Sequence, residues 1–147
     1  MSIDLFEVLL AESYSYTQAQ KHTKGLKIWE TKNIFCPINV NGNHWMLLVV
    51  DVERKTMHFY DSLMSDVWRY FQAAERWLAD EPSQGGGMYG WNYENSRSPK
   101  QDNGFDCGVF MLANANALGS GQLLSHTQAD CPRLREEMAK EIVLGKC

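Results

Sequence analysis

The sequence has no long apolar run, no basic block and no export signal at its start. Its 147 residues carry 14 basic and 18 acidic side chains, which give a formal net charge of −4. No apolar run approaches the 18 residues of a transmembrane helix, and the first ten residues lack the basic segment and the cleavage site of a signal peptide. The acidic balance argues against a general nucleic-acid binder. We expect one domain over residues 1–147 that binds neither nucleic acid nor a membrane.

Cysteine is also scarce, and its spacing excludes the common metal sites. The sequence holds Cys36, Cys107, Cys131 and Cys147. No two of them form a Cys-x-x-Cys pair, and the four histidines lack zinc-site spacing, so no metal site is expected. There is no phosphate-binding glycine motif, and we expect no cofactor. A chain of this length buries a core without cross-links, so free thiols in a reducing, intracellular compartment are expected, with two disulfides as the less favoured alternative.

The apolar pattern predicts an α+β domain, because strand-like and helical stretches are mixed without regular alternation. Residues 44–52 are almost continuously apolar and predict a buried strand, with residues 56–61 as its returning partner. Pro37 interrupts the strand before them and indicates an edge position or a bulge. We expect strands over residues 34–40, 44–52 and 56–61, a turn at 41–43, and helices over 3–10, part of 14–27, 65–80, 107–118 and 132–144.

Two of the predicted helices and one loop carry specific expectations. The helix over residues 107–118 is apolar on almost all sides, so it should be central and buried, and Gly119 is placed to end it. Residues 81–100, with a triple glycine, form the only long loop, which is either a surface insertion or a functional loop. The helix over residues 65–80 is amphipathic. Its apolar face consists of Val67, Trp68, Phe71, Ala74, Trp77 and Leu78.

Cys107 lies between a polar, glycine-containing run and an apolar run, at the start of a predicted helix. Unpaired backbone N–H groups and the helix dipole favour a thiolate there. Gly104 and Gly108 keep its surroundings open. The alternative is a buried helical cysteine with a packing role, which is the more common fate of a single cysteine.

The predicted hairpin brings a base and an acid together. His44 begins its first strand and Asp61 ends the second. A short connection places these two ends directly opposite each other or one diagonal step apart, within reach of their side chains. A cysteine nucleophile needs such a base and a group that orients it. The alternative is a histidine at the end of a strand with no catalytic role.

Three polar residues near Cys107 have separate expectations. The amide of Gln101 can donate a hydrogen bond to the oxyanion of a tetrahedral intermediate, beside the backbone N–H of Cys107. Asp102 and Asp106 are not assigned as the orienting acid, because a carboxylate beside a thiolate raises the thiol pKa. Asp106 is expected to cap the helix instead.

Three separated motifs now stand in a fixed order: His-Trp at residues 44–45, Tyr-Asp-Ser-Leu at 60–63 and Gln-Asp-Asn-Gly-Phe-Asp-Cys-Gly at 101–108. In this order they closely resemble the ubiquitin-like-protein-specific cysteine proteases, also called sentrin/SUMO-specific or Ulp-type proteases. The resemblance covers roughly residues 5–144.

The resemblance implies an α+β fold with a papain-like cysteine protease core, in which helices flank a small mixed or antiparallel sheet and the nucleophile begins a central helix. His44, Asp61 and Cys107 would form the catalytic triad, and Gln101 would complete the oxyanion hole. Trp45 would form one wall of the narrow tunnel that admits the glycines of the substrate, or would simply be a core tryptophan.

The function that the resemblance implies is thiol-dependent cleavage after the C-terminal Gly-Gly of a ubiquitin-like modifier, SUMO-type above all. The partners would be that modifier and its conjugates, in the nucleus, the cytoplasm or both. One departure is that the family's upstream Trp-Leu-x-Asp-like segment has no counterpart in this sequence. Two alternatives stay open: a catalytically impaired modifier-binding module, and a related His-Asp-Cys protein acetyltransferase.

Overall fold

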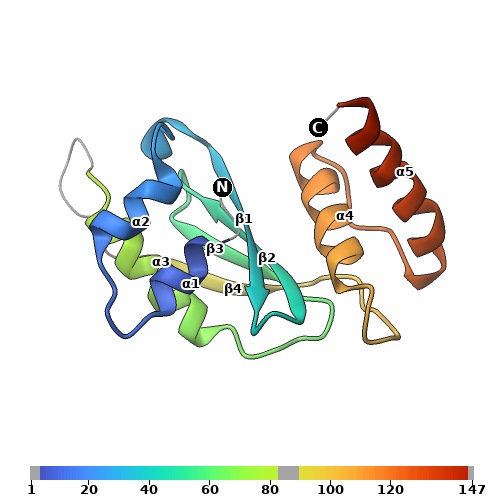
Figure 1. Cartoon of the computed structure of the whole chain (residues 1–147), viewed down its shortest axis with the longest axis horizontal. Coiled ribbons are helices and arrows are strands. Elements are labelled where there is room, and N and C mark those ends of the chain that lie inside the picture. The colour runs from blue at the N-terminus through green and yellow to red at the C-terminus, as the bar shows by residue number, and fades with distance from the viewer. Residues whose placement is uncertain (1–3, 83–89, 146–147) are drawn as a thin grey trace.

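The computed structural model describes residues 4–82 and 90–145 of the chain. Helices at both ends enclose a four-stranded sheet (Figure 1). The helices are α1 (Leu5–Leu10), α2 (Tyr16–Thr23), α3 (Trp68–Asp80), α4 (Cys107–Gly119) and α5 (Cys131–Leu144), with short 3₁₀ turns η1 (Ile28–Glu30) and η2 (Gln128–Asp130). The strands are β1 (Asn33–Val40), β2 (His44–Asp51), β3 (Thr56–Tyr60) and β4 (Asn92–Ser96).

The sheet is mixed and has the order β1-β2-β3-β4. β1 pairs antiparallel with β2, and β2 pairs antiparallel with β3, whereas β4 runs parallel to β3. Pro37 stands on the edge strand β1 opposite Leu47, with no break in the register. Proline is tolerated there because the outer side of an edge strand needs no ladder hydrogen bond. Of the two expectations for Pro37, the edge position is confirmed.

The β1–β2 turn has the backbone conformation that the sequence indicates. Asn41 and Gly42 have φ values of 53° and 77°, and the N–H of Asn43 donates to the carbonyl of Val40 at 3.2 Å. Two consecutive positive φ values are typical of the primed turns that match the twist of a hairpin, and asparagine and glycine adopt them at the lowest cost. The turn therefore fixes where β2 begins, which is at His44.

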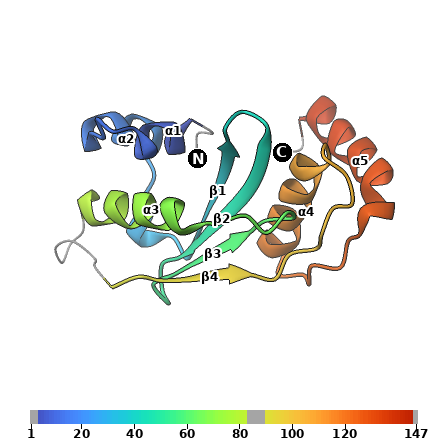
Figure 2. The same cartoon turned by 90° about the horizontal axis from the view of Figure 1, so that it is seen from below.

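The two faces of β2 contact different helices. Met46, Leu48 and Val50 lie in the larger core with α1 and α3. Leu47 and Val49 contact the opposite side, where Met111 of α4 covers them. Figures 1 and 2 show the result: α1, α2 and α3 lie on one side of the sheet, and α4 with α5 lies on the other. A strand packed on both faces needs an apolar residue at nearly every position, which explains the continuous apolar run of β2.

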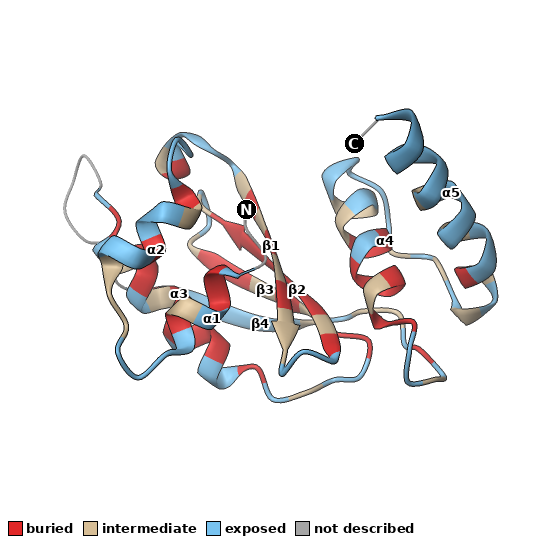
Figure 3. Ribbon diagram, in the orientation of Figure 1, coloured by how far each residue is buried: buried red, intermediate tan, exposed pale blue. Residues whose placement is uncertain are grey.

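α4 is central but not buried on all sides. It packs between the sheet and α5, where Val109 and Phe110 contact Cys131. The expected central, buried position is confirmed for most of its apolar residues, but Leu112 is 47% exposed, so one side of the helix reaches solvent. α5 is exposed over almost its whole length (Figure 3) and covers α4 from one side only.

Two further sequence expectations need correction. Trp68, placed on the buried face of α3, is 46% exposed and instead contacts Phe71 and Tyr93, with ring centroids 5.3 and 5.4 Å away. It is the first residue of α3 and lies at the edge of the core, next to the buried Val67. Residues 81–100 are not one continuous loop, because they contain β4; the triple glycine Gly85–Gly87 lies outside the described residues.

Candidate active site

His44 and Asp61 meet as the hairpin predicts. The last β2–β3 pair is Leu47 with Tyr60, so the continued register places Asp61 opposite Met46 and one diagonal step from His44. The side chains are in contact, with 2.7 Å between His44 Nε2 and Asp61 Oδ1. Both residues are buried, at 8% and 2% exposure. The sequence prediction that these two residues are within reach of each other is confirmed.

The surroundings of Asp61 keep its carboxyl group ionised. Burial alone would raise its pKa, but hydrogen bonds from the backbone N–H groups of Leu63 and Ser65, together with His44, outweigh burial and lower the pKa below its usual range. The backbone donors lie 2.9 Å from Oδ1 and 2.7 Å from Oδ2. A carboxylate that accepts several such bonds is stabilised in its charged form.

An ionised Asp61 determines the tautomer of His44. A carboxylate can only accept, so Nε2 of His44 carries the proton that it donates. In the neutral ring, Nδ1 then has a free lone pair. Nδ1 is buried and has no hydrogen-bond partner among residues 4–82 and 90–145. This nitrogen is therefore the basic position of the pair.

Cys107 is the first residue of α4 and is buried, at 6% exposure. It lines a cavity of about 550 Å³ together with Asn43 and Trp45, the two chain neighbours of His44. Gly108 lies against Trp45, since a Cβ added at this glycine would stand 3.6 Å from Trp45 Cδ1. The structure thus places Cys107, Trp45 and the turn residue Asn43, which precedes His44, around one cavity.

Gln101 is held near the same site by Ser62 of the second motif and by Asn103 of its own motif. Its side-chain oxygen accepts a hydrogen bond from Ser62 Oγ at 2.6 Å, and its amide nitrogen donates to the carbonyl of Asn103. Ser62 follows Asp61 directly, so Gln101 is coupled to the histidine–carboxylate pair through one neighbour. One N–H of the Gln101 amide is not used by these contacts, because an amide nitrogen has two donors.

The expected capping by Asp106 is wrong. Asp106 does occupy the N-cap position of α4, and its carbonyl accepts from Phe110 N at 3.0 Å, but its side chain makes no capping hydrogen bond. The carboxylate instead accepts hydrogen bonds from Asn103, Gln128 and Arg135. Sequence reasoning missed Gln128 and Arg135. The only contact of this carboxylate that lies close in sequence is the one from Asn103, three residues earlier.

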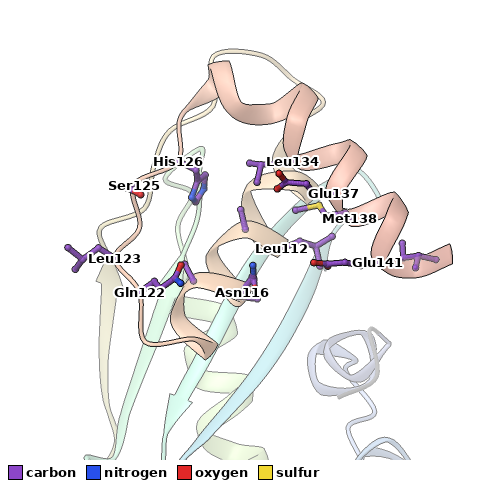
Figure 4. Close-up of a pocket in the computed structure, with 14 residues that line it drawn as sticks. Leu112, Asn116, Gln122, Leu123, Ser125, His126, Leu134, Glu137, Met138 and Glu141 are labelled. Atoms are coloured by element: carbon purple, nitrogen blue, oxygen red, sulfur yellow. The ribbon is translucent and has the colours of Figure 1, made fainter. Parts of the chain in front are cut away.

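A second cavity lies away from these residues. It measures about 440 Å³ between α4, α5 and the segment that joins them, and Leu112, Glu137 and His126 help to line it (Figure 4). None of the predicted catalytic residues lines it. His126 is half-buried, with its ring 5.2 Å from that of Phe110.

The described part of the chain offers no cluster of three or more metal-ligating side chains. Within the same residues, no helix is long and apolar enough to cross a membrane. Cys107 and Cys131 both carry free thiols.

Comparison with known proteins identifies the group to which this arrangement belongs. The family model "Ulp1 protease family, C-terminal catalytic domain" matches residues 7–145. Sentrin-specific protease 3 of Homo sapiens is 30% identical over 131 residues, which are 86% of this chain and 23% of that protein. Putative ubiquitin-like-specific protease 1B of Arabidopsis thaliana is 30% identical over 148 residues, 93% of this chain and 43% of the relative. The chain thus spans less than half of these relatives.

Solved structures show the same fold. The C-terminal Ulp1 protease domain in complex with Smt3, the yeast ortholog of SUMO, has a TM-score of 0.85 at 24% identity and covers 98% of this chain and 66% of that chain. SUMO protease Ulp1 with its catalytic cysteine oxidised to a sulfinic acid has a TM-score of 0.81 at 26% identity, over 97% of this chain and 67% of that chain. The predicted α+β, papain-like core is confirmed. The chain belongs to the Ulp1 protease family.

Proposed function

We propose that this chain is a cysteine-type peptidase that cleaves after the C-terminal Gly-Gly of a ubiquitin-like modifier of the SUMO type, either to mature the precursor or to release the modifier from a lysine. The observation that carries the proposal is the buried His44–Asp61 pair, 2.7 Å apart, with Nδ1 of His44 unpartnered among the described residues and with both chain neighbours of His44, Asn43 and Trp45, lining the Cys107 cavity. A base oriented by a carboxylate next to a thiol is the arrangement that nucleophilic cysteine catalysis requires.

The first half of the reaction forms a thioester. His44 Nδ1 accepts the thiol proton, and Cys107 Sγ attacks the carbonyl carbon of the terminal glycine. The resulting imidazolium is stabilised by Asp61, and the tetrahedral oxyanion accepts hydrogen bonds from the Cys107 backbone N–H and the free N–H of Gln101. When the C–N bond breaks, the imidazolium donates its proton to the leaving amine.

The second half is hydrolysis. His44 removes a proton from water, the hydroxide attacks the thioester carbonyl carbon, and Cys107 leaves as the thiolate, which regains its proton. The products are the modifier with a free glycine carboxylate and the released amine. No cofactor takes part in any of these steps.

Trp45 supports the specificity for glycine. Its indole and Gly108 at the start of α4 line the cavity with Cys107, and a Cβ at position 108 would stand 3.6 Å from Trp45 Cδ1, an ordinary contact distance. A narrow passage between an indole and a helix terminus accepts residues without side chains and excludes larger ones. The site of action that we propose, the nucleus or the cytoplasm, follows from the partner, since conjugated SUMO is intracellular.

The test is covalent labelling by a SUMO protein whose C-terminal glycine carries an electrophile. Wild-type protein should form one adduct, at Cys107. Cys107→Ser should form none, and Cys131→Ser serves as the matched control because it removes another buried thiol and should label normally. A wild type that stays unlabelled, or a Cys107→Ser variant that labels equally well, would reject the proposal. Acetyl transfer from acetyl-coenzyme A without hydrolysis would favour the acetyltransferase alternative.

A further inference from the structure

Asp106 presents an electrostatic problem for the proposed nucleophile. It directly precedes Cys107 in the chain, and a carboxylate next to a thiolate disfavours the charged sulfur. An aspartate at an N-cap position usually accepts hydrogen bonds from the first helical N–H groups. That contact would hold its negative charge at the same helix terminus that Cys107 uses.

The side chain of Asp106 makes a different set of contacts. It is almost completely buried, at 3% exposure, and it makes no capping hydrogen bond to α4. Its Oδ2 accepts from Asn103 Nδ2 at 2.7 Å and from Gln128 Nε2 at 2.6 Å. Its Oδ1 accepts from Arg135 Nε at 3.1 Å and from Nη2 of the same guanidinium. All the oxygen acceptors of this carboxylate are therefore turned toward donors outside α4.

Arg135 supplies the only positive charge among these donors. Two of its nitrogens, Nε and Nη2, donate to the same oxygen, Oδ1, and hydrogen bonds between two charged groups are stronger than neutral ones. The same guanidinium donates to the carbonyl of Phe105 at 3.3 Å. It also lines the cavity that contains Cys107. Arg135 of α5 thus contacts the backbone carbonyl of Phe105 and the side chain of Asp106, the two residues before Cys107.

We propose that Arg135 is a positioning residue for the Cys107 nucleophile: by pairing with Asp106 it neutralises the carboxylate beside the thiolate and keeps that carboxylate away from the N–H groups at the start of α4. This inference rests on the proposed function, because it assigns a role relative to Cys107 as nucleophile. It makes α5 part of the catalytic assembly rather than a peripheral helix.

The charged neighbours of this site agree with the assignment. The hydrogen bond from Asn103, against the opposing effect of burial, and the bonds from Arg135 and Gln128 lower the pKa of Asp106 to about 2. Asp106 is therefore a full negative charge at every pH at which the protein would act. Its effect reaches a second thiol, since burial first and Asp106 next raise the pKa of Cys131.

Among the described residues, three other ionisable groups from elements near the start of α4 have partners of their own or are exposed. His44, on β2, is paired with Asp61. In η2, Asp130 is bonded to Thr127 and Arg133. Asp102, in the loop, is exposed and contributes only its backbone N–H, to Gln128 Oε1 at 2.9 Å. Arg135 is thus the cation whose loss should change the charge at Cys107.

The experiment measures the rate at which iodoacetamide alkylates Cys107 as a function of pH, with the modified peptide quantified by mass spectrometry. The reagent is uncharged, so the rate below the midpoint of the profile reports the thiolate fraction. The variants are Arg135→Gln, Arg135→Lys, Asp106→Asn and the double variant Asp106→Asn/Arg135→Gln. Arg133→Gln is the matched control, since Arg133 lies on the same helix but pairs with Asp130 and Glu137.

Arg135→Gln should slow alkylation on the acidic limb by about tenfold, since an unpaired like charge beside a titrating group shifts its pKa by about one unit or more. Arg135→Lys should lie closer to the wild type, because it keeps the charge. The double variant should recover most of the loss, which a merely structural role of Arg135 would not produce. Arg133→Gln should leave the profile unchanged.

Superimposable profiles for the wild type and Arg135→Gln would overturn the inference, and so would a double variant as slow as Arg135→Gln. If Arg135→Gln does not fold, the double variant is compared with Asp106→Asn alone. Their profiles should coincide, because Arg135 then has no carboxylate to neutralise, and a tenfold difference would overturn the inference. Labelling of the wild type by the SUMO electrophile decides the proposed function separately.

Discussion

Replacing Asp61 with asparagine is the sharpest test of the proposed catalytic pair, because it changes charge without changing volume. Asp61 Oδ1 accepts from both His44 and the N–H of Leu63, and Oδ2 accepts from the N–H of Ser65. An amide has one oxygen, so one of these sets of donors must face an NH₂ group. The less costly orientation keeps the oxygen on the His44 side and leaves the Ser65 N–H without an acceptor.

Two effects follow, and their magnitudes differ. The unsatisfied N–H of Ser65 should lower the free energy of unfolding by about 1–3 kcal/mol. The imidazolium of His44 loses its counter-charge, and a charge-assisted hydrogen bond of roughly 3 kcal/mol corresponds to about 10²-fold in rate. The other amide orientation would force the wrong tautomer of His44 and extend the loss in kcat toward 10⁴-fold.

The assay is kcat on a SUMO protein with a fluorogenic C-terminal leaving group, measured beside denaturant unfolding of the same samples. Asp51→Asn is the matched control. Asp51 is a buried carboxylate at the opposite end of β2 that also accepts a backbone N–H, from Arg54 at 2.9 Å. It should lose stability and keep kcat. A folded Asp61→Asn protein with kcat within threefold of the wild type would refute the assignment of Asp61.

Three further predictions concern catalysis and stability. Gln101→Ala should lower kcat by about 10²–10³-fold with little change in KM, because the amide that Ser62 orients acts on the transition state; steady-state kinetics check this. Glu81→Ala removes a buried carboxylate that accepts three side-chain hydrogen bonds from α2 and α3, so denaturant melts should show a loss of about 2–4 kcal/mol with unchanged kcat per folded molecule. Asp61 and Asp106 both have folded-state pKa values below their unfolded values, to about 2 for Asp106. Their stabilising effect is present above pH ~4 and is lost as pH falls through the folded values, so unfolding free energy should drop most steeply between pH ~4 and ~2, and Asp106→Asn should flatten that drop.

The hairpin that brings His44 and Asp61 together could be predicted because everything that defines it is close in sequence. Asn41 and Gly42 fix the turn, the apolar run fixes β2, and a short connection fixes the register of β3. The distance between His44 and Asp61 then follows from strand geometry. The resemblance to the Ulp-type proteases supplied the roles of Cys107 and Gln101, which stay predictions; the family match confirms the family and the fold.

β4 could not be predicted from its own residues. Its five positions are exposed or half-buried, with no apolar alternation to indicate a strand. It forms because its backbone extends the sheet at β3, more than 30 residues earlier in the chain. Trp68 shows the complementary limit: helical periodicity predicts a face of α3, but only the packed structure decides where the core under that face ends.

Asp106 shows what the sequence by itself determined and what the tertiary structure decided. The sequence determined its place at the start of α4, because the change from polar to apolar residues and the helical pattern are local signals. The partners of its carboxylate were decided by the packing of η2 and α5 against α4, which brings Gln128 and Arg135 to it from 22 and 29 residues away. Local propensity favours capping by an aspartate at this position by about 1 kcal/mol. The Arg135 guanidinium and two amide donors around the buried carboxylate outweigh that preference, and they become available only when the chain is folded.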